Sequence, residues 1–399
     1  MENKQVKLLT FLIKTESKKC PPENLFPVNE ERLLALAGRN KAIPFVFHFL
    51  DCPSCKKRLT KKTIKKLPQY QKPLLLWPLL YRKEKQALGK FCRKERIKIV
   101  LLKDFSSYPK MKFHHEYLMG TDLDILVKEK DLGKIESFLK KTGYKLREHL
   151  KLKDSQGKLY YQEKTFIHPK RHINLDLHTQ LAIPHKDEFH FLEKKTINQI
   201  TKTLFQNALP VGKQSLLCRP NKEYFLFSLI THCLASDLLK GLRNLFDIIQ
   251  FASLYDKEIN WKKFLSLTKR FKITNFSYFI LLLGSQIFAL PFPQGLRKNI
   301  QIPFRVRLLV SYWSVEKIAL FPPIEQWAIK NKETKRIFYE NFFIKMFLFN
   351  SVSFWRLIRP RVFLFISRIG LIWFSKAASR LYRKFPLSKS NQHQLPEAE

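Results

Sequence analysis

Acidic side chains recur in two short segments whose residues alternate between apolar and polar. Asp122 and Asp124 belong to the first segment, residues 120–127, and Asp176 belongs to the second, residues 173–178. Alternation is typical of a strand with one buried face, so Asp122 and Asp124 point the same way, about 7 Å apart. If the second strand runs beside the first, three carboxylates share that face and repel one another unless a cation lies between them. The pattern predicts a Mg²⁺ site of the kind that accompanies a nucleoside triphosphate.

An alternative is a surface strand whose acidic residues only face water. This alternative is disfavoured because Asp is a poor strand former and recurs here at positions of one face. The chain is also short of acidic residues, with 33 Asp and Glu against 74 Lys and Arg. We therefore keep Asp122, Asp124 and Asp176 as the candidate catalytic and metal-binding residues.

The elements that position these carboxylates can be followed along the chain. Residues 97–102, which are apolar except for Lys98, predict a buried strand. Residues 131–142 carry apolar side chains at helical spacing and are followed by a glycine that suits a helix end. Residues 145–167 predict two paired strands around a polar turn at residues 154–158. This pair of strands leads directly into the strand that carries Asp176.

The order of these segments resembles the nucleotidyltransferases of the polymerase-beta-like superfamily, in particular the bacterial group called uncharacterised nucleotidyltransferases. The residues that carry the resemblance are Ile99-Val100-Leu101-Leu102-Lys103, Tyr108-Pro109, Asp122 to Val127, Gly143-Tyr144 and Leu175-Asp176-Leu177-His178. Their order and spacing are fairly specific, and the resemblance covers roughly residues 30–255. It implies an α+β fold, with a polymerase-beta-like nucleotidyltransferase core of a small mixed sheet and helices, flanked by N- and C-terminal helical regions.

The activity that the resemblance implies is nucleotidyl transfer by a two-metal mechanism, with NTP as substrate and a hydroxyl of an unknown acceptor as target. Asp122 and Asp124 would hold both Mg²⁺ ions, and Asp176 would complete the ion that lowers the pKa of the acceptor hydroxyl. His178 lies on the same strand face. It would either orient Asp176 or contact the acceptor, and the orienting role is the favoured one.

The turn after the first strand departs from the family pattern. Relatives carry glycine there, which lets backbone N–H groups and a helix start approach the triphosphate. This chain has Asp104 instead, followed by Ser106 and Ser107. We expect Lys103, Ser106 and Ser107 to bind the nucleotide. A carboxylate would repel phosphate unless it turns away or helps to hold metal, so the alternative is a catalytically inactive nucleotidyltransferase-fold binding module, peripheral at a membrane.

Composition and periodicity divide the chain into five regions. We expect an N-terminal helical region, the nucleotidyltransferase core, a helical region packing on the core, a basic aromatic helical region and a disordered tail, at residues 1–95, 96–215, 216–300, 301–390 and 391–399. In the third region, His232, Arg243 and Asp247 match polar positions of the family, although Arg243 and Asp247 could also pair with each other. Cys52 and Cys55 form a lone CxxC pair, for which incidental or weakly redox-active thiols are favoured over zinc.

The balance of charge bears on partners and location. The formal net charge of +41 favours anionic partners such as nucleotide, nucleic acid or an acidic membrane surface. Residues 341–390 hold ten Lys or Arg, no Asp or Glu and twelve aromatics. This segment predicts either an amphipathic helix lying on an anionic membrane or a helix packed on the domain, with nucleic acid a less favoured partner. Six scattered Cys and an N-terminus with no secretory signal predict a cytoplasmic protein, with peripheral association at the inner face of the membrane as an alternative.

Overall fold

The computed structural model describes residues 4–15, 21–26, 29–50, 57, 60–111, 122–153, 159–171, 173–181, 194–212, 215–235, 241–297 and 302–312. All of these residues lie in the first of two units of the chain, residues 1–349. The predictions for Cys52 and Cys55, the turn at 154–158 and residues 341–390 fall outside the described residues.

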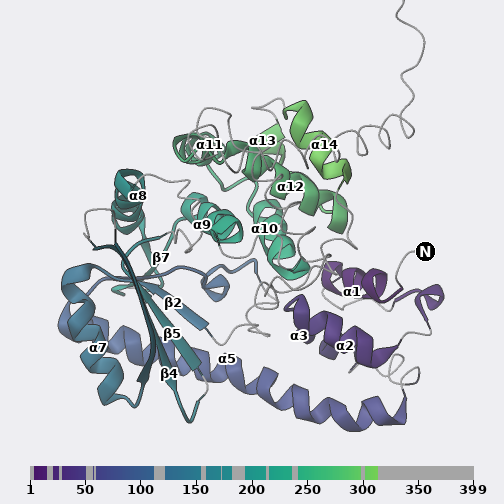
Figure 1. The fold of residues 1–399 in the computed structure, drawn as a ribbon, viewed down its shortest axis with the longest axis horizontal. Coiled ribbons are helices and arrows are strands. Elements are labelled where there is room, and N and C mark those ends of the chain that lie inside the picture. Colours follow the sequence, from purple (N-terminus) through teal and green to yellow (C-terminus); the bar gives the residue numbers. More distant parts are fainter. Residues whose placement is uncertain are drawn as a thin grey trace, which may run out of the picture. The chain divides into compact units, whose positions relative to one another are not determined.

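A mixed β-sheet lies among helices at the centre of the region that holds the predicted carboxylates (Figure 1). Its described strands are β1 (Ile99–Leu101), β2 (Asp122–Leu126), β3 (Lys145–Lys153), β4 (Leu159–His168), β5 (Ile173–His178), β6 (Leu209–Pro210) and β7 (Leu217–Arg219). They are hydrogen-bonded in the order β3-β4-β5-β2-β1-β7-β6. β2 is parallel to β5 and antiparallel to β1, while β1 is parallel to β7. Strands distant in sequence therefore meet at the centre of the sheet.

Helices surround this sheet and build the two flanking regions. They are α1 (Lys4–Lys14), α2 (Glu30–Arg39), α3 (Ile43–Leu50), α5 (Lys61–Glu95), α7 (Leu132–Lys141), α8 (Lys194–Asn207), α9 (Lys222–Ala235), α10 (Leu242–Leu254), α11 (Trp261–Arg270), α12 (Thr274–Phe288), α13 (Gln294–Arg297) and α14 (Phe304–Tyr312). The expected mixed fold of helices and strands is confirmed.

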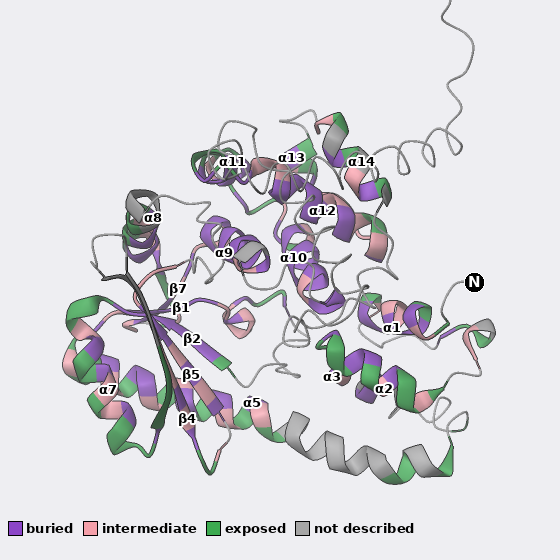
Figure 2. Ribbon diagram, in the orientation of Figure 1, coloured by how far each residue is buried: buried purple, intermediate pink, exposed green. Residues whose placement is uncertain are grey.

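The two faces of the sheet pack against different helices. On one face, Leu123, Ile125 and Leu177 are buried in a cluster with residues of α5 and α7. On the other face, Val100 and Leu126 join a larger cluster that includes side chains of α1 to α3 and α9 to α14. Alternate strand residues are thus drawn into separate cores, and each fully buried aliphatic side chain contributes about 1.5–3 kcal/mol to folding. Figure 2 shows buried residues along β2 and along α9 and α10.

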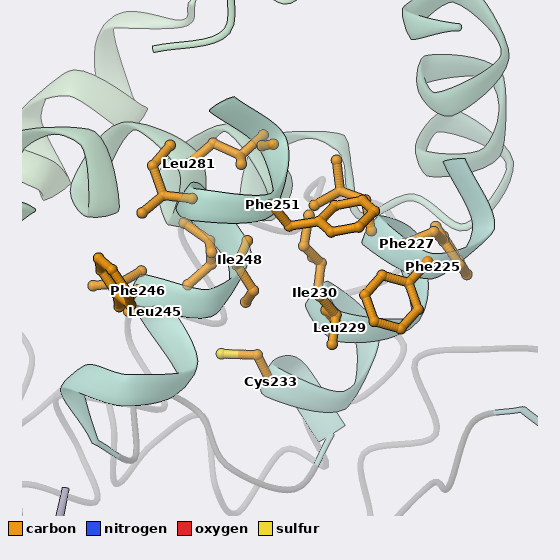
Figure 3. Close-up of a cluster of buried hydrophobic side chains, with 14 of the residues drawn as sticks. Phe225, Phe227, Leu229, Ile230, Cys233, Leu245, Phe246, Ile248, Phe251 and Leu281 are labelled. Carbon is orange, nitrogen blue, oxygen red and sulfur yellow. The ribbon is translucent and has the colours of Figure 1, made fainter. Parts of the chain in front are cut away.

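The larger core is rich in aromatic rings, which hold α9 and α10 together. Phe225 and Phe251 are in contact, with ring centroids 4.8 Å apart, and Phe246 lies edge-on to Phe45 of α3 at 6.0 Å. Figure 3 shows this cluster, with Phe227 and Ile230 of α9 beside α10. The packing connects the N-terminal helices with the helical region that follows the sheet.

Most local sequence predictions in the core are confirmed. β2 and β5 coincide with the two alternating segments, and α7 ends at Lys141, two residues before Gly143, whose φ of 93° suits glycine. The expected pair of strands is β3 and β4. The N-terminal region is helical as expected, and its 35-residue helix α5 continues through three prolines. Within the described residues, no helix is both long and apolar enough to cross a membrane.

Candidate active site

The register of β2 and β5 brings the predicted carboxylates to one part of the sheet. Asp124 is the direct partner of Asp176 across the parallel strands, and Asp122 is the partner of Asn174. Neighbouring strands lie about 4.8 Å apart, so the backbones of Asp124 and Asp176 are adjacent. Asn174 Nδ2 donates a hydrogen bond of 2.8 Å to Asp122 Oδ1. The expectation that the second strand runs beside the first is confirmed.

Asp124 is buried and its carboxylate has two basic neighbours. Lys103 Nζ lies 3.0 Å from Asp124 Oδ1, and His178 Nε2 lies 3.1 Å from the same oxygen. Burial alone would raise the pKa of Asp124, but the Lys103 charge and the His178 contact outweigh burial and hold this pKa well below its usual range. On its other side, His178 Nδ1 lies 3.8 Å from Glu163 Oε2. His178 therefore contacts Asp124 in this structure rather than Asp176.

Asp176 has the opposite electrostatic environment. Its Oδ1 atom is buried and has no hydrogen-bond partner among the described residues. Burial, together with the negative charge of Asp124, raises the pKa of Asp176 to about 7. A buried carboxylate oxygen without a donor is costly, and a cation at this place would remove that cost.

The present side-chain conformations do not form a finished metal site. Among the described residues, no three His, Cys, Asp or Glu side chains gather closely enough to hold an ion. Asp122 is hydrogen-bonded to Asn174, and Asp124 is paired with Lys103. The sheet register supplies adjacent carboxylates, but these carboxylates must turn before they can share a cation.

The turn after β1 contains a buried carboxylate, that of Asp104. Asp104 is buried and forms an ion pair of 2.5 Å with Lys85 of α5. Ser106 Oγ donates to Asp104 at 2.5 Å, and Ser107 Oγ donates to the same carboxylate. The short 3-10 helix Phe105–Ser107 is thus built around Asp104. Asp104 does not line the pocket that holds Asp122 and Asp124. Both serine hydroxyls donate to Asp104 in this structure, and the predicted contacts of Ser106 and Ser107 with phosphate stay predictions.

A pocket of about 170 Å³ lies over the first two aspartates. Asp122, Asp124 and Lys103 line it from the sheet, and the remaining polar lining comes mainly from helices. The helical residues include His232 of α9, Arg243 of α10 and Lys41, which follows α2. The two helical regions therefore complete the walls of the site.

Two of these helical residues match the sequence predictions and one was missed. Arg243 Nε and Asp247 Oδ1 are 2.5 Å apart, so these two residues pair within α10, which was one of the two alternatives for them. His232 is half-buried and lines the pocket. Sequence reasoning missed Lys41, because a lysine after a helix in so basic a chain carries no distinguishing signal.

A second, larger pocket lies at the opposite ends of β1, β2 and β5. Its volume is about 660 Å³, and Lys98, Val127, Thr179 and Phe205 are among its lining residues. None of the three predicted catalytic aspartates lines it. This pocket is the larger of the two, but Asp122 and Asp124, two of the predicted catalytic residues, line the smaller one.

Comparison with known proteins agrees with this arrangement. A family profile described as "Uncharacterised nucleotidyltransferase" matches residues 27–289, which is more than half of the chain. No curated protein and no solved structure matches the sequence. The matched range contains β1, β2 and β5, and it also contains the helices that contribute Lys41, His232 and Arg243 to the pocket. The chain therefore belongs to the uncharacterised nucleotidyltransferase family.

Proposed function

We propose that the protein is a Mg²⁺-dependent nucleotidyltransferase that moves a nucleoside monophosphate from an NTP to a hydroxyl of an acceptor. The observation that carries this proposal is the pairing of Asp124 with Asp176 across parallel strands, beside a pocket that also contains Asp122. Membership of a nucleotidyltransferase family supports the same reaction class.

The carboxylates fit the binding of Mg²⁺, which prefers oxygen ligands. Asp122, Asp124 and Asp176 would hold two ions, and the buried oxygen of Asp176 without a hydrogen-bond donor supports this fit. Bound Mg²⁺ would neutralise phosphate charge and lower the pKa of the acceptor hydroxyl.

Lys103 and His178 have separate roles in the proposal. Lys103 neutralises Asp124 and also lines the pocket, so its charge is available to a phosphate group once the carboxylate has another cation. His178 is buried and contacts Asp124, which favours a role in holding that carboxylate over contact with an acceptor.

The test is release of pyrophosphate from each of the four NTPs in the presence of Mg²⁺. We expect Asp122→Ala combined with Asp124→Ala to lower this activity at least about a hundredfold, because charge stabilisation by bound metal would be lost. Glu148→Gln is a suitable control, since it removes an exposed carboxylate of the same sheet far along β3. Activity unchanged in the double variant would contradict the proposal.

The second candidate is a catalytically inactive binding module with the same fold. The turn after β1 favours it, because Asp104 stands where relatives carry glycine and both serine hydroxyls serve that carboxylate. This alternative predicts nucleotide binding without pyrophosphate release. Membrane association through residues 341–390 is a further proposal that rests on the sequence alone, and liposome flotation with and without that segment tests it.

A further inference from the structure

Lys41 occupies an unusual backbone position at the end of α2. Its φ of 53° lies in the left-handed region, and Ala42 N bonds to Ala37 O at 2.8 Å while Lys41 N bonds to Gly38 O at 3.1 Å. These are the hydrogen bonds of a Schellman helix end, where glycine is the usual residue because it has no Cβ. The fold itself would therefore be better served by glycine at this position.

The corner that carries Lys41 is fixed to the start of α10. The buried side chain of Asn40 accepts a hydrogen bond of 2.9 Å from Leu242 N. Gly241 has φ of 86°, and a Cβ there would lie 3.1 Å from Asn40 Cα. Only glycine permits the two backbones to approach this closely. This junction brings Lys41 and Arg243 into the lining of one pocket.

Cations from three parts of the chain line the pocket. Lys41, Lys103 and Arg243 lie there together with the carboxylates of Asp122, Asp124 and Asp247. Lys103 contacts Asp124, Arg243 contacts Asp247, and Lys41 is exposed. Mg²⁺ held by the aspartates would leave these cations to a phosphate chain. Lysine is a common point-charge partner of phosphate.

The size of the pocket limits which part of a ligand can fit inside it. At about 170 Å³ it is smaller than the roughly 300–1,000 Å³ of sites that enclose a whole drug-sized ligand. A phosphate chain is the part of a nucleotide that combines small cross-section with high charge. We propose that Lys41, together with Lys103, binds the polyphosphate chain of the nucleotide in this pocket. The inference rests on the proposed function, because it names the side chains that hold the phosphates of that substrate.

Two other helix ends provide matched controls. Arg96 after α5 and Lys272 after α11 have φ of 54° and 57°, so they repeat the backbone conformation and the charge of Lys41. Neither of them lines the pocket. Each of these residues can be replaced by glycine, in Lys41→Gly, Arg96→Gly and Lys272→Gly. Each substitution removes one positive charge and places glycine where φ is positive.

The experiment is calorimetric titration of the full chain with inorganic triphosphate and Mg²⁺ at fixed ionic strength, repeated with each NTP. We expect Lys41→Gly to weaken binding at least about tenfold, because a charge-assisted contact is lost. Lys41→Arg should retain most of the affinity. Arg96→Gly and Lys272→Gly should bind within about twofold of the unmodified protein, because distant exposed charges are screened by salt. Thermal unfolding checks that all variants fold.

The outcomes separate this inference from the proposed function. Equal weakening by all three glycine variants would mean non-specific attraction and would overturn the role of Lys41. If Lys41→Gly binds like the unmodified protein while Asp122→Asn with Asp124→Asn loses pyrophosphate release, only the inference about Lys41 fails. If the unmodified protein binds neither triphosphate nor any NTP, both proposals fail.

Discussion

Lys85 of α5 neutralises Asp104 in the turn after β1 through an ion pair of 2.5 Å, and the Asp104 side chain is fully buried. The sequence resemblance leads us to expect glycine at this turn, and the ion pair with Lys85 shows how this chain accommodates the carboxylate of Asp104 instead. Lys85 of α5 balances the charge of Asp104, and the oxygens of Asp104 also accept hydrogen bonds from Ser106 and Ser107.

Removing one partner of this pair should destabilise the fold strongly. We expect Lys85→Met to lower the free energy of unfolding by about 3–5 kcal/mol, since an uncompensated carboxylate stays buried. Adding Asp104→Ala should recover part of that loss in a double-mutant cycle measured by urea unfolding. The half-exposed pair of Lys110 and Glu258 is the control, and Lys110→Met should cost less than about 1 kcal/mol. Additive effects of Lys85→Met and Asp104→Ala would contradict a coupled pair.

His178 should act on the reaction through Asp124. We expect His178→Ala to lower kcat for pyrophosphate release about 10- to 100-fold with little change in KM for the nucleotide, because the carboxylate loses its orienting contact. His178→Gln should recover much of the activity, since its amide nitrogen can replace Nε2. His168→Asn on β4 is the control, because that buried histidine packs on Tyr144 instead. A matching loss in the control would assign the effect to folding.

The thiol of Cys92 should be unreactive in the folded protein. Burial, and to a smaller extent Cys218, raises the pKa of Cys92 to about 12. At pH 8 this leaves roughly a thousandfold less thiolate than in an ordinary cysteine, and the thiolate is the reactive form. Alkylation by iodoacetamide, followed residue by residue with mass spectrometry, should modify Cys92 only after unfolding in urea. Rapid modification of Cys92 in native buffer would show that the core around α5 and β1 is open.

Two glycines should respond in opposite directions to alanine. Gly241→Ala places a Cβ against the backbone of Asn40 at positive φ, and we expect a loss of about 2 kcal/mol or more in unfolding free energy. Gly133 lies in α7, and a methyl group added there would meet no neighbour within 4 Å, so Gly133→Ala should stabilise by about 0.5–1 kcal/mol. Urea unfolding curves test both, and stabilisation by Gly241→Ala would contradict the close junction between α2 and α10.

The parts of the fold that depend on local patterns could be predicted from the sequence. Alternation of apolar and polar residues located β2 and β5, and the helical spacing of apolar residues before Gly143 located α7. Both patterns depend only on residues close together in the sequence. The adjacency of Asp124 and Asp176 needed one additional assumption, that the two strands pair, and the structure confirms it.

The parts of the site that depend on distant contacts could not be predicted. Lys85 is one of many lysines in a long basic helix, and nothing near it in sequence marks it as the partner of Asp104. Lys41 reaches the pocket because Asn40 contacts Leu242, a residue 202 positions later. Such pairings are decided by how whole elements pack, and residue patterns within one element do not encode them.

The contact between Asn40 and Leu242 also has a consequence for how the protein is made. Lys41 leaves the ribosome about two hundred residues before the helix start that fixes its position, so the pocket is assembled only after the sheet has been synthesised. An excised fragment holding the seven strands alone would carry the aspartates but lack the wall contributed by Lys41, α9 and α10. Nascent chains released before residue 242 should therefore lack part of the lining of this pocket.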